Sequence, residues 1–389
     1  MPAFSLDEYQ TRIELVQARM RASGIDVLWV TSPPNMNYLS GYDAWSFYVH
    51  QGLLVGLDEP RPIWIGRKID IPCLRHTSFL KPEQASGYGD EFLSPPAHAM
   101  DFVASVVHSK GWARSVIGVE MDAPYFTALA YERLRSSLPH CRLVDADRLV
   151  NWVRIVKSPR ELEYLNQAGE ITDIAMKVGI DAIAPGVRHC DVAGVVYQAL
   201  ISGHPEFCGD APDYQTMPKG RRTDAPHLTW TDERYTIGEG CTLELGANRF
   251  RYHAPLSRTV YVGKAPKRLV ALSEFVREGL ESALSAVKPG VSCESIEAAW
   301  RRVAARAGIE KESRIGYSVG LGYPPDWGER TASLMPGDQT VLSPDMVFHL
   351  ILGIWGNDQG YELSETFRVT QSGYSCFSKL PRTLFLRDR

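Results

Sequence analysis

The chain has 389 residues, of which 44% are hydrophobic and 23% charged, and its formal net charge is −4. This length allows two domains with sizeable cores, and the composition is that of an ordinary globular protein. The weak negative charge excludes a strongly basic surface, so we expect no nucleic-acid partner.

No apolar run approaches the roughly 20 residues needed to cross a bilayer, so we expect no membrane association. The first residues have neither the basic region nor the apolar region of a signal peptide. The seven cysteines are odd in number and scattered, without a C-x-x-C pair. This pattern disfavours disulfides and zinc sites, and together these features predict a cytoplasmic location.

The first part of the chain alternates strand and helix patterns. The capping box Ser5-Leu-Asp-Glu8 predicts a helix that runs to about Ala22, and residues 25–30 read as a buried strand. Further strands are predicted at 52–55, 62–65 and 116–119, and further helices near 98–110 and 124–136. The alternation indicates an α/β domain with a mixed sheet, which we assign to residues 1–152.

The second part begins with another capping box, Ser158-Pro-Arg-Glu161, which predicts a long helix to about Ile183. Helical patterns follow at about 267–287 and 293–307, and strand-rich stretches lie at 241–262, 340–354 and 361–370. Helices followed by strands, twice over, indicate an α+β domain over residues 153–389. Its helices are expected to back a curved antiparallel sheet.

The segments 242–246 and 251–259 resemble a metal-binding strand pair of the creatinase/aminopeptidase P superfamily, the pita-bread enzymes. There, an Asp-x-Gly is followed by a second Asp eleven residues after the first, and then by Arg-Thr. Arg258 and Thr259 lie in register, so Glu244 occupies the first Asp position and Pro255 the second. The resemblance spans essentially the whole chain. It implies a creatinase-like α/β N-terminal domain and a pita-bread catalytic domain.

Superfamily members bind divalent metal with two Asp, one His and two Glu. By local register, the histidine position falls on Tyr317, the first glutamate near Ile351, and the last glutamate on Ser364 or Glu365. At most two carboxylates remain, whereas divalent metals need several oxygen or imidazole ligands. We therefore expect no metal and no cofactor.

One superfamily histidine is retained. His227 lies seventeen residues before Glu244, which is the spacing of the catalytic histidine in creatinase, a metal-free member. The resemblance therefore implies that His227 is an acid/base and Glu244 its catalytic partner. The creatinase arginines and glutamates that hold creatine fall on unsuitable residues here, among them Val49, Gly328 and Ser257, which disfavours creatine.

Several blocks resemble the ectoine hydrolases, a metal-independent group within the superfamily. They are residues 41–51, 119–122, 149–152, 225–230, 251–259 and 322–331. The loops 208–220 and 352–360 depart from that group's pattern. The resemblance implies hydrolysis of a cyclic amidine and leaves ectoine, 5-hydroxyectoine and related compounds open.

Ectoine carries a carbon between two nitrogens that share one positive charge, so this carbon is electrophilic without a metal. A carboxylate at Glu244 would hold the cation and act either as the nucleophile or as the base that activates water. His227 titrates near neutral pH and would donate a proton to the departing nitrogen. The product would be N-acetyl-diaminobutyrate.

The resemblance also marks residues for contact with the substrate. They are Trp45, Phe47, Tyr48, His253, Arg258, Tyr317, Asp326, Trp327, Arg330 and Glu365. Arg258 and Arg330 are candidate donors to the substrate carboxylate, although Arg258 also suits a structural role. In creatinase-like dimers the segment around Trp45 reaches the partner's active site, which implies a homodimer.

Three alternatives stay open at this point. The chain could act on another small guanidino or amidine substrate, as a creatinase-like amidinohydrolase. It could be a metal-dependent Xaa-Pro peptidase, or a pita-bread protein without catalytic activity that binds a partner.

Overall fold

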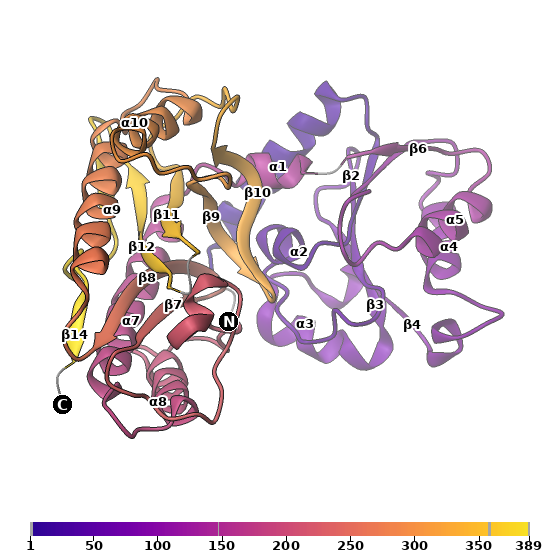
Figure 1. Ribbon diagram of the computed structural model, residues 1–389. Coiled ribbons are helices and arrows are strands. Elements are labelled where there is room, and N and C mark those ends of the chain that lie inside the picture. The colour runs from indigo at the N-terminus through magenta and orange to yellow at the C-terminus, as the bar shows by residue number, and fades with distance from the viewer. Residues whose placement is uncertain (1–2, 147, 357–358, 388–389) are drawn as a thin grey trace. The chain divides into compact units, whose positions relative to one another are not determined.

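The computed structural model describes residues 3–146, 148–356 and 359–387. The chain divides into two compact units, Met1–Arg154 and Ile155–Arg389 (Figure 1). The division expected between residues 152 and 153 lies nearby. Among the described residues, no helix has the length and apolar character needed to cross a membrane.

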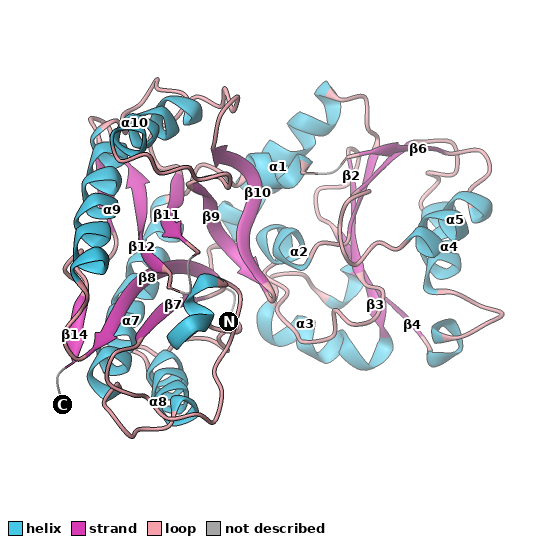
Figure 2. Ribbon diagram, viewed as in Figure 1, coloured by secondary structure: helices cyan, strands magenta, loops and turns pink. Residues whose placement is uncertain are grey.

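The N-terminal unit is built on a six-stranded sheet (Figure 2). In spatial order its strands are β4 (Ala85–Tyr88), β3 (Ile63–Arg67), β2 (Gly52–Gly56), β1 (Val27–Val30), β5 (Val116–Val119) and β6 (Arg142–Asp145). Strand β2 runs antiparallel to β1 and β3, whereas the other pairs are parallel. The predicted mixed sheet is therefore confirmed.

Helices cover both faces of this sheet. Successive residues of a strand point to opposite sides, and all four residues of β1 are buried, so both sides need apolar cover. Trp29 of β1 packs in a core with residues of α4 (Ala99–Ser109) and α5 (Ala128–Ser137). Leu28 packs in a second core with residues of α1 (Leu6–Ala22), α2 (Pro33–Ser40) and α6 (Leu149–Val153). This unit also contains α3 (Ile71–Thr77) and short 3₁₀ turns at Lys68–Asp70, Pro82–Gln84 and Asp90–Leu93.

The predicted start of the first helix is confirmed. The side chain of Ser5 accepts a hydrogen bond from the backbone N–H of Glu8, and the apolar face of α1 is buried. The sequence did not predict α2, which follows the predicted strand at residues 25–30. Proline fits the first turn of a helix, where its missing N–H is not needed, and α2 begins at Pro33.

The C-terminal unit holds an eight-stranded sheet backed by helices (Figure 2). Its path runs β13 (Tyr374–Cys376), β12 (Tyr361–Val369), β11 (Val347–Ile354), β9 (Gly316–Tyr323), β8 (Tyr252–Val262) and β14 (Phe385–Arg387). Strand β10 (Asp326–Leu334) pairs with β9, and β7 (Gly240–Arg249) pairs with β8. Every pairing is antiparallel except that of β14 with β8.

Two helix pairs back this sheet, which confirms the predicted α+β pita-bread architecture. Helix α7 (Pro159–Ala182) packs on β7, β8 and α8 (His189–Ser202). Helix α9 (Lys267–Ser285) packs on β12 and α10 (Cys293–Arg306), and a 3₁₀ turn spans Gly220–Asp224. The hairpin of β9 and β10 was not predicted, because register shifts between Asp326 and Ser333 break the alternation that marks a strand.

A buried arginine ties three parts of the C-terminal unit together. Arg258 of β8 donates from Nη1 to the carbonyl oxygens of Ser257 and Ser364, at 2.9 and 2.7 Å. Its Nη2 donates to Glu365 Oε1 at 2.7 Å and to Leu380 O at 3.1 Å, and its Nε donates to Pro381 O at 2.9 Å. A guanidinium has five N–H groups, and all five are used here.

We expect Arg258→Met to lower the free energy of unfolding by about 3 kcal/mol or more, because it leaves Glu365 buried beside one remaining cation. The matched control is Arg277→Met, which removes an exposed pair with Glu281 at 3.4 Å and should cost less than about 1 kcal/mol. Urea unfolding of both variants measures the difference. Equal midpoints would contradict a structural role for Arg258.

Candidate active site

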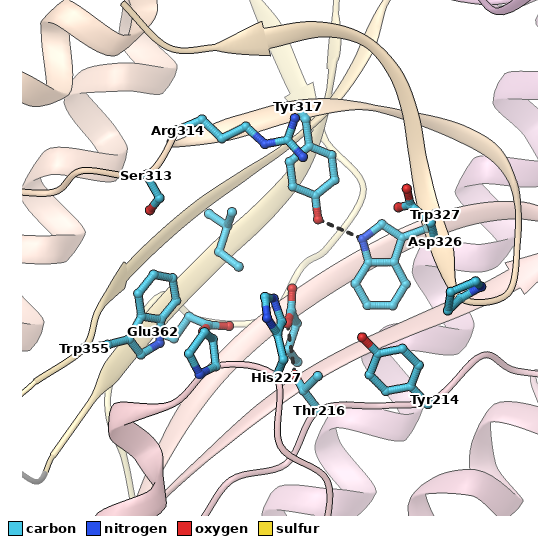
Figure 3. Close-up of a pocket in the computed structure, with 14 residues that line it drawn as sticks. Tyr214, Thr216, His227, Ser313, Arg314, Tyr317, Asp326, Trp327, Trp355 and Glu362 are labelled. Carbon is cyan, nitrogen blue, oxygen red and sulfur yellow. Dashed lines mark hydrogen bonds between the residues drawn. The ribbon is translucent and has the colours of Figure 1, made fainter. Parts of the chain in front are cut away.

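A cavity of about 410 Å³ lies in the C-terminal unit (Figure 3). Strands β7, β9, β10, β11 and β12 contribute to its wall, together with the segments around residues 214–227 and 313–314. The lining residues are Tyr214, Thr216, Pro226, His227, Glu244, Ser313, Arg314, Tyr317, Pro325, Asp326, Trp327, Ile351, Trp355 and Glu362. The fold thus brings residues from widely separated parts of the sequence to one space.

Glu244 is a buried carboxylate on the wall of this cavity, and only 6% of the residue is exposed. Its Oε2 accepts a hydrogen bond from Thr216 Oγ1 at 2.9 Å. Two backbone hydrogen bonds between the same residues fix the 214–219 segment against β7. Burial raises the pKa of Glu244 to about 8, and the nearby charge of Glu362 adds to the rise.

Glu362 of β12 is a second buried carboxylate on the same cavity. Ser257 Oγ donates a hydrogen bond to its Oε1. Burial raises the pKa of Glu362 to about 7, although the hydrogen bond from Ser257 and the positive charge of Lys311 oppose the rise. Two carboxylates that both protonate near neutral pH form a site that favours a bound cation.

The sequence missed Glu362, because the last superfamily glutamate was placed on Ser364 or Glu365. Strand residues alternate between faces, so Glu362 and Ser364 share one face of β12 and Glu365 lies on the other. Glu365 is buried against Arg258 and Arg382 and does not line the cavity. Glu362 and Glu365 are three residues apart, and an odd spacing on a strand places two side chains on opposite faces. This spacing was the signal in the sequence that only one of them could face the cavity.

His227 lines the cavity from the segment that follows the 3₁₀ turn at 220–224, and its side chain is exposed. In Figure 3 the labelled side chains of His227 and Glu362 face the same space as Tyr317 and Trp327. The imidazole of His227 is therefore in contact with both the cavity and the solvent.

Aromatic side chains form another part of the wall. Trp327 Nε1 donates to Tyr317 Oη at 2.9 Å, and Asp326 Oδ1 accepts from the Gly328 N–H at 2.7 Å, which shapes the turn into β10. The predicted residues Tyr317, Asp326 and Trp327 therefore line the cavity together with Glu244 and His227.

Arg314 lies over the ring of Tyr317, with 4.3 Å between its guanidinium carbon and the ring centroid. Its Nη1 donates to Ser333 Oγ at 2.9 Å. The sequence did not select Arg314, because it stands in the turn before β9 and belongs to no motif. It provides positive charge at the cavity, where a carboxylate of a ligand needs a donor.

Besides Glu365, three predicted contacts of the C-terminal unit do not line the cavity. Arg258 has all its N–H groups bonded within the protein, which leaves none for a substrate. Arg330 is exposed and stands outside the lining residues. His253 is fully buried, and its Nε2 lies 3.3 Å from Asp213 Oδ2. Its ring centroid lies 6.5 Å from that of Trp327, so His253 packs behind this wall residue.

The predicted aromatic residues of the N-terminal unit lie between α2 and β2. Trp45 and Tyr48 are exposed, and Phe47 packs on Trp45 with 5.4 Å between ring centroids. Phe47 and Tyr48 line a separate cavity of about 540 Å³ within this unit. Their contact with a substrate stays a prediction.

Both loops that depart from the ectoine hydrolase pattern contribute to the cavity. Tyr214 and Thr216 belong to the loop 208–220, and Trp355 belongs to the loop 352–360. Residues 357–358 of the second loop lie outside the described residues. The wall is therefore formed partly by the two loops that depart from the ectoine hydrolase pattern.

The donor set does not fit the metal pair of the pita-bread peptidases. Within the part of the chain that the structure describes, no three His, Cys, Asp or Glu side chains are grouped so that they could hold a metal ion. At the ligand positions Tyr317 and Ile351 line the cavity, and Pro255 pairs with Gly246 across the two strands. Hard divalent ions need more oxygen or imidazole donors than this.

Comparison with known proteins finds two domain families along the chain. Residues 12–156 match the creatinase/prolidase N-terminal domain, and residues 163–371 match metallopeptidase family M24. An uncharacterized hydrolase/peptidase of Sinorhizobium fredii, y4tM, is 45% identical over 99% of both chains. The ectoine hydrolase of Halomonas elongata is 41% identical over 99% of this chain and 98% of its own.

Solved structures support the same fold. The dipeptidase PepE of Mycobacterium ulcerans has a TM-score of 0.84 at 21% identity and covers 99% of this chain, with all of its own length matched. A likeness at this identity establishes the architecture alone. Together with the matched domains and relatives, it shows that the chain is a hydrolase of carbon–nitrogen bonds that belongs to metallopeptidase family M24, with a creatinase/prolidase N-terminal domain.

Proposed function

We propose that the cavity binds ectoine, or a close relative such as 5-hydroxyectoine, and hydrolyses it to N-acetyl-diaminobutyrate without a metal. The observation that carries this proposal is the pair of buried carboxylates, Glu244 and Glu362, in a cavity that also holds Arg314. A zwitterionic cyclic amidine has a cation that can bind to the two carboxylates and a carboxylate that can bind to Arg314. The similarity to the ectoine hydrolase of H. elongata supports this choice of substrate.

Binding of the cation would change the protonation of the site. Burial raises the pKa values of both carboxylates in the free protein, and the charge of Glu362 adds to the rise at Glu244. A bound amidinium favours their ionised forms, since an opposite charge stabilises a carboxylate. The substrate would thereby ionise the group that attacks it, and its positive carbon would need no polarising metal.

Glu244 then acts either as the nucleophile or as the base that removes a proton from water. In the water-mediated form, the water oxygen bonds to the amidinium carbon and the C=N electron pair moves to nitrogen. The carbon–nitrogen bond then breaks while the oxygen becomes the amide carbonyl. Both water protons end on the departing nitrogen, which leaves as an ammonium group, and His227 delivers one of them.

Incubation with ectoine, followed by mass spectrometry of the products, tests this proposal. We expect wild type to form N-acetyl-diaminobutyrate, and Glu244→Gln to lose at least about 10³-fold in kcat because the attacking group is gone. His227→Ala should lose about 10²- to 10⁴-fold. Glu281→Gln, on the exposed face of α9, is the matched control and should keep full activity. If wild type opened a different cyclic amidine and left ectoine intact, the proposed reaction would stand and ectoine would be rejected as the substrate.

The raised pKa of Glu244 also predicts a stability effect that needs no substrate. The unfolded chain loses this proton near its ordinary pKa of 4.5, whereas the folded protein keeps it until about pH 8. Between these values the folded state binds more protons, so stability falls as pH rises.

We therefore expect Glu244→Gln to be more stable than wild type at pH 8, by on the order of 1 kcal/mol or more, with the gain vanishing towards pH 4.5. Urea unfolding across this pH range measures the difference, with Glu281→Gln as the control for an exposed glutamate. A gain that stays constant with pH would contradict burial of an ionisable Glu244.

The competing function is a metal-dependent Xaa-Pro peptidase. We expect the purified protein to carry no stoichiometric Mn, Co, Fe or Zn, and EDTA to leave ectoine hydrolysis unchanged, because the cavity offers too few donors. Elemental analysis and assays of ectoine and an Xaa-Pro dipeptide, with and without chelator, decide between the two functions. Cleavage of the dipeptide that depends on metal would overturn the proposal. A homodimer stays a prediction from the resemblance, which analytical ultracentrifugation would test.

A further inference from the structure

A chain of hydrogen bonds runs behind the cavity wall from Trp327 to Ser257. Trp327 Nε1 donates to Tyr317 Oη, and Tyr317 Oη lies 3.2 Å from His349 Nδ1. His349 Nε2 lies 2.7 Å from Ser364 Oγ, which also accepts from the Ser257 N–H at 2.6 Å. His349 and Ser364 are fully buried, so their hydrogen-bonding groups must be satisfied inside the protein.

The protons in this chain can be placed by elimination. Burial lowers the pKa of His349 to about 3, with a further contribution from the charge of Arg314. The imidazole is therefore neutral and carries a single N–H. If that hydrogen were on Nε2, Ser364 Oγ would accept two bonds, and its own buried hydrogen would have no acceptor among the described residues.

The other tautomer satisfies the fully buried pair, His349 and Ser364. Ser364 Oγ then donates to Nε2 of His349, and Nδ1–H donates to Tyr317 Oη. The tyrosine oxygen accepts two hydrogen bonds, from His349 and from Trp327. Its own hydrogen has no acceptor among the described residues and is left for the cavity that Tyr317 lines.

We propose that Tyr317 donates a hydrogen bond to the oxygen that adds to the reacting carbon, and that His349 is the positioning residue that keeps Tyr317 a donor. The inference deepens the proposed hydrolysis and rests on it. A delocalised amidinium has no free lone pair to accept from Tyr317, so the donor finds a partner at the reacting centre only when the new oxygen arrives. Such a contact stabilises the transition state more than the bound substrate.

The position of Tyr317 supports this role. Burial, together with the negative charge of Glu244, raises the pKa of Tyr317, so its hydroxyl stays protonated and lies within electrostatic reach of the Glu244 carboxylate. The new carbon–oxygen bond forms where Glu244 activates its nucleophile. Tyr317 gives up no proton in this step, since both water protons pass to the departing nitrogen.

The tautomer is measured directly by nuclear magnetic resonance of protein labelled with ¹⁵N-histidine. The His349 signals are assigned by their loss in His349→Gln. We expect Nδ1 to be protonated, Nε2 to be unprotonated, and neither to titrate between pH 5 and 9. A hydrogen on Nε2 would overturn the inference. This experiment uses no substrate, so its result does not depend on whether ectoine is hydrolysed.

The catalytic part is tested by steady-state kinetics with ectoine. Tyr317→Phe keeps the ring under Arg314 and removes only the hydroxyl. We expect its kcat to fall about 10²-fold or more while KM changes less than about threefold. Tyr374→Phe, which alters an exposed tyrosine on β13, is the matched control and should keep wild-type values.

A variant pair separates positioning from packing. His349→Asn offers an amide N–H near the Nδ1 position and should recover part of the activity that His349→Phe loses. Equal losses in the two variants, or a Tyr317→Phe enzyme that changes KM alone or keeps full kcat, would reject the inference. If wild type does not act on ectoine but shows the expected tautomer, the proposed substrate fails while the donor assignment for Tyr317 stands.

Discussion

The burial of two carboxylates in one cavity is the constraint around which the C-terminal unit is organised. Desolvation disfavours the charge of Glu244 and of Glu362, and the charge of Glu362 further disfavours that of Glu244. The sheet offsets part of this cost with hydrogen bonds from Thr216 and Ser257. The charged forms of the two carboxylates remain incompletely stabilised by the protein. A cationic ligand in the cavity would stabilise them further.

Strand alternation separates this functional pair from a structural one. On β8, Ser257 faces the cavity side and donates to Glu362, whereas the next residue, Arg258, faces the other way and binds Glu365. The two glutamates of β12 are thus equally buried but have opposite tasks. Glu365 is neutralised permanently by arginine, and Glu362 is left incompletely compensated at the cavity.

The sequence predicted those site residues whose positions follow from spacing to a recognisable motif. Arg258 and Thr259 placed Glu244 on its strand, and the spacing to His227 followed from it. Glu362 was missed because the last superfamily glutamate was located by residue spacing alone, which does not say which face of β12 each residue occupies. Arg314 was missed because a turn residue has neither periodicity nor a motif. The two units and their sheet types followed from the strand and helix patterns, but the bulged hairpin of β9 and β10 did not, since bulges break alternation.

In the proposed metal-free site, other side chains occupy the space that the metal donors take in the pita-bread peptidases. Here the space is filled by side chains that hydrogen-bond to one another, from Tyr317 through His349 to Ser364, with Ile351 beside them. A neutral network of this kind supplies directed donors but no positive charge. In the proposed function, the positive charge at the reacting carbon must come from the substrate, since Arg314 is assigned to the substrate carboxylate. Peptide bonds are neutral and do not meet this condition, whereas amidines do. In the proposed function, the exchange of donors changes the class of substrate through electrostatics, without a change in the architecture of the sheet.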